Sequence, residues 1–163
     1  MILIISFQEI YSIKFYGGEL MGLDIVSSDN KKSFHIGYFG FTRMRGYFVL
    51  GKSEELYEDY EEIEGASMAW IPSECRSVNE EEFYNDIGDL SILIKHSDCD
   101  GKLTSEECKL LKKELIIDEK KIRSLENYNN NPKHCEGVLK LMTEFTDLIN
   151  YCAENDSVEL IFT

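Results

Sequence analysis

Basic residues, prolines and paired cysteines are scarce in this sequence, and each shortage excludes a class of protein. Only two prolines occur among 163 residues, and no low-complexity tract or internal repeat is present. Apolar residues make up 43% of the chain and aromatic residues 12%, so the chain is not a disordered one. The five cysteines form no CxxC pair, which argues against a secreted disulfide framework and favours reduced thiols in the cytoplasm. No apolar run is long enough to cross a membrane, and the opening MILIISFQEI lacks the basic start and cleavage site of a signal peptide.

The charge of the chain is strongly acidic, with 17 basic residues against 31 acidic ones and a formal net charge of −14. A phosphate backbone would be repelled by such a protein, so we expect no direct nucleic-acid binding. An acidic surface keeps a protein soluble, and it also suits a mimic of nucleic acid that occupies the basic groove of an enzyme. Apolar residues still make up 43% of the chain, enough for one domain with a core.

The start of the domain is open to two interpretations. The stretch FYGGELMGLDI at 15–25 contains Gly-Gly-Glu, which purine-rich codons resembling a ribosome-binding sequence can encode, followed by Met21. One hypothesis is that residues 1–20 are translated upstream sequence or a peripheral segment, and that 21–163 form a single globular domain. The alternative is an ordinary apolar strand at the N-terminus, with the two glycines as a turn.

The spacing of apolar residues predicts a small single domain of the α+β class, with a few strands and about four helices. Short β-branched runs near both ends of the domain indicate strands at 22–28 and 157–163. Helical spacing and capping residues predict helices over 53–65, from Asn79, over 105–115 and from Pro132 to 154. Three segments are less regular: a glycine-containing helix at 42–50, a loop or edge strand at 66–74, and a strand or helix end at 90–95.

The most distinctive local motif is HSDCDGKLTSEE at 96–107, which resembles the EF-hand calcium loop. That loop takes oxygen ligands at positions one, three, five, seven, nine and twelve, with glycine at six. The departure is histidine in first place, because imidazole is a poor ligand for a hard cation. The resemblance implies a site for a divalent metal, either weakly bound calcium or a transition metal, with five candidate ligands: His96, Asp98, Asp100, Lys102 through its carbonyl, and Glu107.

A purely structural interpretation of the same loop stays open. Asx turns and Gly101 account for the turn, and Thr104 with Glu107 forms a capping box that starts a helix. A zinc variant is a further alternative, with ligands drawn from His96, Cys99, Cys108, His134 and Cys135. The sequence alone does not choose among these.

A second candidate site lies in FHIGYFGFTRMR at 34–45, where arginines and aromatics are close together in a chain otherwise poor in arginine. Guanidinium groups with aromatic walls suit an anionic or nucleotide-like ligand. We therefore predict ligand-binding roles for His35, Tyr38, Arg43 and Arg45. The alternative is that the aromatics are core residues and the arginines pair with the acidic segment 54–64.

Three stretches, MGLDI at 21–25, GYFGFTRMR and HSDCDG at 96–101, together resemble an uncharacterised family of short bacterial and phage-encoded proteins. The resemblance covers the chain from Met21 onwards and implies a small cytosolic accessory protein. It assigns no reaction, but it makes His96 part of the motif and not a lost calcium ligand.

Three functions follow as expectations. The first is an acidic, non-catalytic binding protein of phage or prophage type that modulates a host factor or host defence by binding a protein or a small anionic ligand. The second is a small metal-dependent hydrolase or nucleotide-processing enzyme centred on His96, Asp98 and Asp100. The third is a nucleic-acid-mimicking inhibitor. The sequence contains no Ser-His-Asp order, P-loop or GxGxxG motif to identify a reaction.

Overall fold

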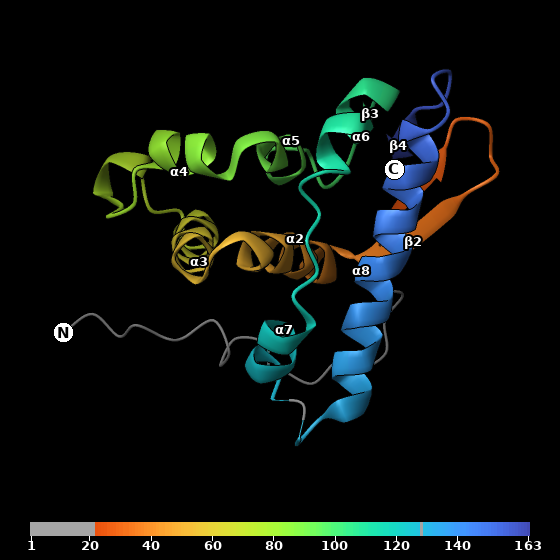
Figure 1. Cartoon of the computed structure of the whole chain (residues 1–163). Helices are drawn as coiled ribbons and strands as arrows, with labels where there is room; N and C mark the ends of the chain where they lie inside the picture. The colour runs from red at the N-terminus through yellow and green to blue at the C-terminus, as the bar shows by residue number, and fades with distance from the viewer. Residues whose placement is uncertain (1–21, 128) are drawn as a thin grey trace.

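The computed structural model describes residues 22–127 and 129–163 (Figure 1). The predicted upstream segment 1–20 and the predicted start at Met21 lie outside these residues. Within them the chain folds as an α+β structure, as predicted: a small antiparallel sheet packs against helices.

The sheet contains four strands in the order β2-β1-β4-β3, and every neighbouring pair is antiparallel. The strands are β1 (Gly22–Ser27), β2 (Ser33–Gly37), β3 (Gly101–Leu103) and β4 (Leu160–Phe162). The strands predicted at the two ends of the domain are confirmed, and they are neighbours in the sheet, with Ile25 opposite Phe162. β2 lies in the aromatic segment, where no strand was predicted.

One face of the sheet forms the core and the other faces solvent. Residues alternate between the two faces of a strand, so the buried side chains are every second residue: Leu23, Ile25, Phe34, Ile36, Leu160 and Phe162. The long helices α2 (Tyr38–Lys52) and α8 (Pro132–Ala153) cover this face. The ring of Phe145 on α8 lies 5.6 Å from Phe34 and 6.1 Å from Phe41, in edge-to-face contacts that join sheet and helices.

Helix α2 confirms the prediction for 42–50 and extends it in both directions. Its glycines are there for packing. A Cβ atom on Gly46 would lie 2.8 Å from the ring of Tyr60, and one on Gly51 would lie 2.2 Å from the carbonyl oxygen of Ile116. Only glycine allows these close approaches. The two glycines lower the helix propensity of α2, but they let it pack closely against α3 and against the chain after α6.

Four of the other helices, α3, α4, α6 and α8, start where the sequence predicts. Ser53 caps α3 (Glu54–Met68), Asn79 caps α4 (Glu80–Ile87) and Thr104 forms a full capping box with Glu107 at α6 (Ser105–Leu111). Pro132 is the first residue of α8, as predicted. The ambiguous residues 90–95 are helical and not a strand, since they contain the single turn α5 (Ser91–Ile94).

The expected number of helices was too low. Residues 22–127 and 129–163 contain six helices of at least seven residues, including the short α7 (Glu119–Leu125), where about four were expected. Single turns of 3-10 helix, η1 (Ser73–Cys75) and η2 (Gly88–Leu90), flank α4. In the part of the chain that the structure describes, no helix has both the length and the apolar content needed to span a bilayer.

Candidate functional site

The two arginines of the predicted ligand site contact different parts of the structure. Arg43 and Arg45 are two residues apart on α2, so their side chains leave the helix in nearly opposite directions. Arg45 is buried and points to the loop after α5, whereas Arg43 is half-buried and points to the end of α7 and the start of α8. The four predicted ligand-binding residues therefore do not form one site.

Arg45 supplies the positive charge at the beginning of the 96–107 loop. Its guanidinium donates hydrogen bonds to the carbonyl oxygens of Ile94 (3.0 Å) and His96 (3.2 Å) and forms an ion pair with the Asp98 carboxylate. Its carbon atom Cζ lies 4.6 Å from the centre of the Phe41 ring. Two carbonyls and one carboxylate are the donor types that a metal ion would use, and here they face a guanidinium.

The other predicted metal ligands have separate partners. The His96 ring lies against Phe162, with centroids 4.0 Å apart, and Asp100 accepts a hydrogen bond from Ser97 Oγ at 2.8 Å. Lys102 pairs with Glu159, and Glu107 closes the capping box by accepting from the Thr104 backbone N–H at 2.8 Å. Among residues 22–127 and 129–163, no three His, Cys, Asp or Glu side chains are grouped to hold a metal ion. The metal site stays a prediction, and these contacts favour the structural interpretation of the loop.

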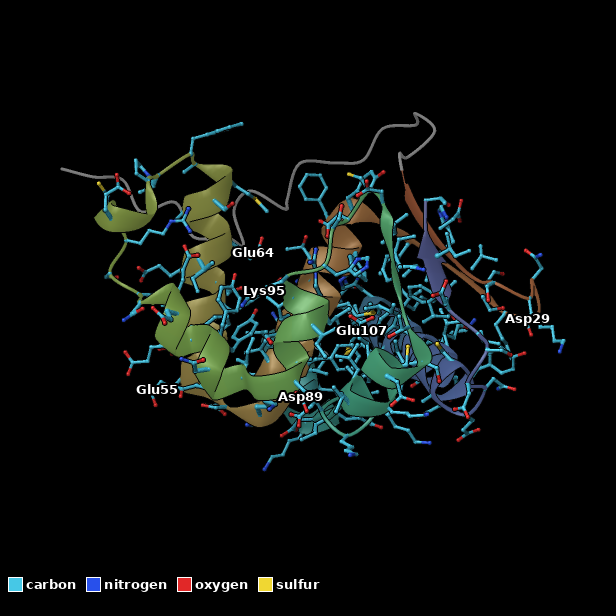
Figure 2. The ribbon with its side chains drawn as sticks, turned by 90° about the horizontal axis from the view of Figure 1, so that it is seen from above. Asp29, Glu55, Glu64, Asp89, Lys95 and Glu107 are labelled. Atoms are coloured by element: carbon cyan, nitrogen blue, oxygen red, sulfur yellow. The ribbon has the colours of Figure 1, made fainter. Side chains whose placement is uncertain are left out.

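A partly buried carboxylate on α3, Glu64, also influences the Arg45 region. Burial raises the pKa of Glu64, the positive charge of Arg45 opposes this, and the negative charge of Asp98 adds to it. Figure 2 shows Glu64 and Lys95 between α3 and α5, and Lys95 Nζ lies 4.1 Å from the centre of the Tyr84 ring. The region around Arg45 therefore contains both acidic and basic side chains.

A different polar network surrounds Arg43. Its Nε donates to the Tyr47 hydroxyl at 2.7 Å, and its Nη2 lies 2.8 Å from Glu126 Oε1. The other carboxylate oxygen of Glu126 lies 3.1 Å from His134 Nε2. The Glu126 side chain is 3% exposed, whereas Arg43 and His134 both reach the surface. A buried carboxylate therefore fixes the positions of two nitrogen-bearing side chains that solvent or a ligand can reach.

Local structure explains how Glu126 and His134 meet. Glu126 is the C-cap residue of α7, and its backbone N–H donates to Ile122 at 2.8 Å. Asn127 then takes a left-handed conformation with φ of 52°, which turns the chain back. Pro132 starts α8, so His134 lies in the first turn of that helix, next to the end of α7.

An apolar pocket of ≈ 200 Å³ lies beside this network, between α2, β2 and α8. Its wall is mainly aliphatic and aromatic, with Arg43 and His134 as the basic members. The lining residues are Ile36, Phe39, Gly40, Arg43, Met44, Tyr47, His134, Val138 and Leu141. A mostly apolar concavity with a few fixed polar groups is the usual form of a small-molecule site.

The arrangement is suited to binding and offers no clear nucleophile. Cys135 follows His134 in sequence, but its side chain is buried, and burial raises the pKa of the thiol. A neutral, buried thiol is a poor nucleophile. The polar groups of the network can orient a ligand and donate hydrogen bonds to it.

The sequence located part of this site. Arg43 was predicted and lines the pocket, but His35 lies on the solvent face of the sheet, 2.7 Å from Asp24, and Tyr38 packs against the core. Glu126 and Tyr47 were missed, because nothing in their neighbouring residues marks them. His134 was considered only together with Cys135 and as a zinc ligand.

No protein-family model, curated protein or solved structure matches this chain.

Proposed function

We propose that this is a non-catalytic binding protein whose pocket between α2 and α8 takes a small ligand with an apolar body and an acidic head group. The observation that supports it is the apolar wall with Arg43 and His134 at one side, both held by the buried Glu126. An apolar wall favours the body of the ligand by burial, and the two side chains favour its anionic end.

The volume of the pocket sets the size of the ligand. An apolar cavity of about 150 Å³ in another protein holds one benzene ring. The pocket here, at ≈ 200 Å³, suits one ring or a short aliphatic chain, with the head group at the open side.

The ionic groups determine which head group is favoured. Arg43 carries a permanent positive charge, and the Glu126 carboxylate places its guanidinium and the His134 imidazole beside the pocket. An incoming carboxylate or phosphate would be stabilised by the guanidinium charge and by hydrogen bonds from it. A neutral alcohol of the same shape would gain only the apolar contact.

This proposal keeps the first of the three expected functions. We propose a cytoplasmic accessory protein, of phage or prophage type, that modulates a host factor or host defence by binding a small anionic ligand. The metal-dependent alternative would need His96, Asp98 and Asp100 to converge, and their partners lie in different directions.

Thermal unfolding with simple probes tests the proposal. We expect phenylacetate to raise Tm in a concentration-dependent way and 2-phenylethanol to raise it less. Val138→Phe fills the pocket from α8 and should remove the phenylacetate effect. Val78→Phe, at a half-buried valine outside the pocket, is the matched control and should keep it. Equal shifts for acid and alcohol, or an unchanged response of Val138→Phe, would contradict the proposal.

A further inference from the structure

The most exposed large apolar side chain among the described residues is Trp70, which is 91% exposed and is the single tryptophan of the chain. Met68 and Ile71 beside it are exposed as well. The three residues form an apolar patch at the end of α3. Exposed aromatic residues of this kind are enriched at the energetic centres of protein interfaces.

The backbone at Trp70 has a conformation that normally selects glycine. Helix α3 ends in a Schellman motif, in which the N–H of Ile71 donates to Ala66 (2.9 Å) and the N–H of Trp70 donates to Ser67 (3.1 Å). Trp70 is the left-handed residue of this motif, with φ of 55°. For a bulky side chain that conformation is unfavourable, and glycine would fill the same position without strain.

The turn is held firmly in place. Arg76 donates from Nε (3.2 Å) and Nη2 (3.0 Å) to the carbonyl oxygen of Ile71, and its Nη1 pairs with Glu80 on α4. Glu62 on α3 accepts backbone hydrogen bonds from Ser77 (3.0 Å) and Val78 (3.2 Å). These bonds join the turn that carries the indole to the chain before α4, and that chain to α3.

Neither packing nor backbone preference explains a tryptophan here. The indole is almost wholly in solvent, so it contributes little to the core, and its backbone conformation costs free energy relative to glycine. A residue that is unfavourable for the fold at an exposed position points to a role outside the fold.

The charge around the patch indicates what it contacts. Residues 53–90, from the cap of α3 to the end of η2, contain thirteen acidic residues and one basic residue, Arg76. We call this segment the acidic lobe. It lies at the end of the molecule opposite the sheet, with α3 and α4 side by side (Figure 1). A groove of ≈ 740 Å³ between these helices is lined by five of its carboxylates: Glu55, Asp59, Glu62, Glu82 and Asp86.

We propose that the acidic lobe docks a protein partner whose surface is rich in lysine and arginine and has an apolar cleft that receives the Trp70 indole. Charge complementarity selects the partner and accelerates the encounter, while the indole supplies the buried anchor. Nucleic acid and anionic membranes are disfavoured by the same charge. This surface is independent of the pocket beside Arg43.

The test uses the whole chain and a synthetic amphipathic peptide of lysine and leucine. We expect the emission of Trp70 to shift to shorter wavelength as the peptide binds, because the indole leaves water. Binding of a labelled peptide, followed by anisotropy, should weaken about tenfold or more in Trp70→Gly. The Tm of this variant should equal or exceed that of the wild type, which separates binding from folding. Ile161→Ala, at an exposed apolar residue on the sheet, should bind like the wild type.

Four outcomes would overturn the proposal. They are wild-type affinity in Trp70→Gly, equal binding of a glutamate-leucine peptide of the same pattern, an equal emission shift on phosphatidylcholine vesicles, and tight binding of duplex DNA. The third would assign Trp70 to a membrane surface instead.

Discussion

At the scale of single residues, Arg45 decides how the 96–107 loop is built. Its side chain is 5% exposed and brings a permanent positive charge to two carbonyl groups and to Asp98. A buried charge is tolerated only when it is paired and hydrogen-bonded. The loop therefore supplies partners for the two terminal nitrogens of the arginine, and the arginine supplies the positive charge that pairs with Asp98.

Replacing Arg45 by methionine keeps the apolar part of the side chain and removes the charge. We expect Arg45→Met to lower the free energy of unfolding by about 3 kcal/mol, because Asp98 and the two carbonyls lose their partner. Denaturant unfolding measures this change. The double variant with Asp98→Asn should lose less unfolding free energy than the two single variants added together.

Calcium should leave the wild-type Tm unchanged, since the guanidinium occupies the oxygen-lined position. A clear rise with calcium would restore the metal interpretation.

The loop also shows what a local motif can and cannot predict. The capping box of Thr104 and Glu107 was predicted and is present, because it depends on residues three apart in sequence. The partner of Asp98 was not predicted, because Arg45 is more than fifty residues earlier and reaches the loop only through tertiary packing. Glu126 was missed for the same reason.

At the scale of elements, the turn between β1 and β2 is tied to helix α8 by one carboxylate. Asp29 accepts hydrogen bonds from Ser27 Oγ (2.7 Å) and from the Tyr151 hydroxyl (2.6 Å), and these lower the pKa of Asp29, with Tyr151 as the largest cause. A carboxylate whose pKa is lower in the folded chain stabilises it above the ordinary value of 3.8, and this stabilisation is lost as the pH falls below that value.

Removing the tyrosine hydroxyl should therefore have a pH-dependent effect. We expect Tyr151→Phe to have a lower Tm than the wild type at pH 7, and the difference should shrink as the pH falls through 3.8 and below. Asp29→Asn should behave similarly, and the double variant should lose less than both single changes together. A Tm difference that stays constant down to strongly acidic pH would show that the contact does not depend on the carboxylate charge.

The elements with strong end signals were predictable, and those fixed by long-range packing were not. Asn79, Pro132 and the capping box mark helix starts in the sequence itself. Strand β2 and the full length of α2 were obscured, since the glycines between 37 and 51 lower the helix propensity and some are required by contacts with Tyr60 and Ile116. Which face of residues 90–95 is buried depends on neighbouring helices, so their sequence alone suits a strand or a helix.

At the scale of the whole molecule, negative charge is concentrated at one end. The acidic lobe accounts for most of the net charge of −14, and the pocket beside Arg43 lies between α2 and α8 on another part of the surface. Like charges held close together destabilise a compact state. Within the lobe, burial and repulsion by Glu55 and Glu62 raise the pKa of Asp59. The lobe is thus the part of the fold that a positively charged partner, or dissolved salt, should stabilise most.

The stability of the chain should therefore rise with salt. The pKa of Asp59 is raised in the folded chain, so its ionisation opposes folding increasingly as the pH rises above 3.8, and at pH 7 the full cost is present. Sodium chloride screens the interactions between exposed charges that lie farther apart than about 10 Å at 0.1 M and about 3 Å at 1 M. We expect Tm to increase over this range at pH 7, and Asp59→Asn to stabilise the chain by about 0.5 kcal/mol at low salt and less at high salt. The control is Asp147→Asn, on the exposed side of α8 and outside the lobe, which should change neither the stability at low salt nor its increase with salt.

Hydrogen exchange should locate the protection gained with salt in α3 and α4. An equal gain in all elements would show that the repulsion is not centred on the lobe.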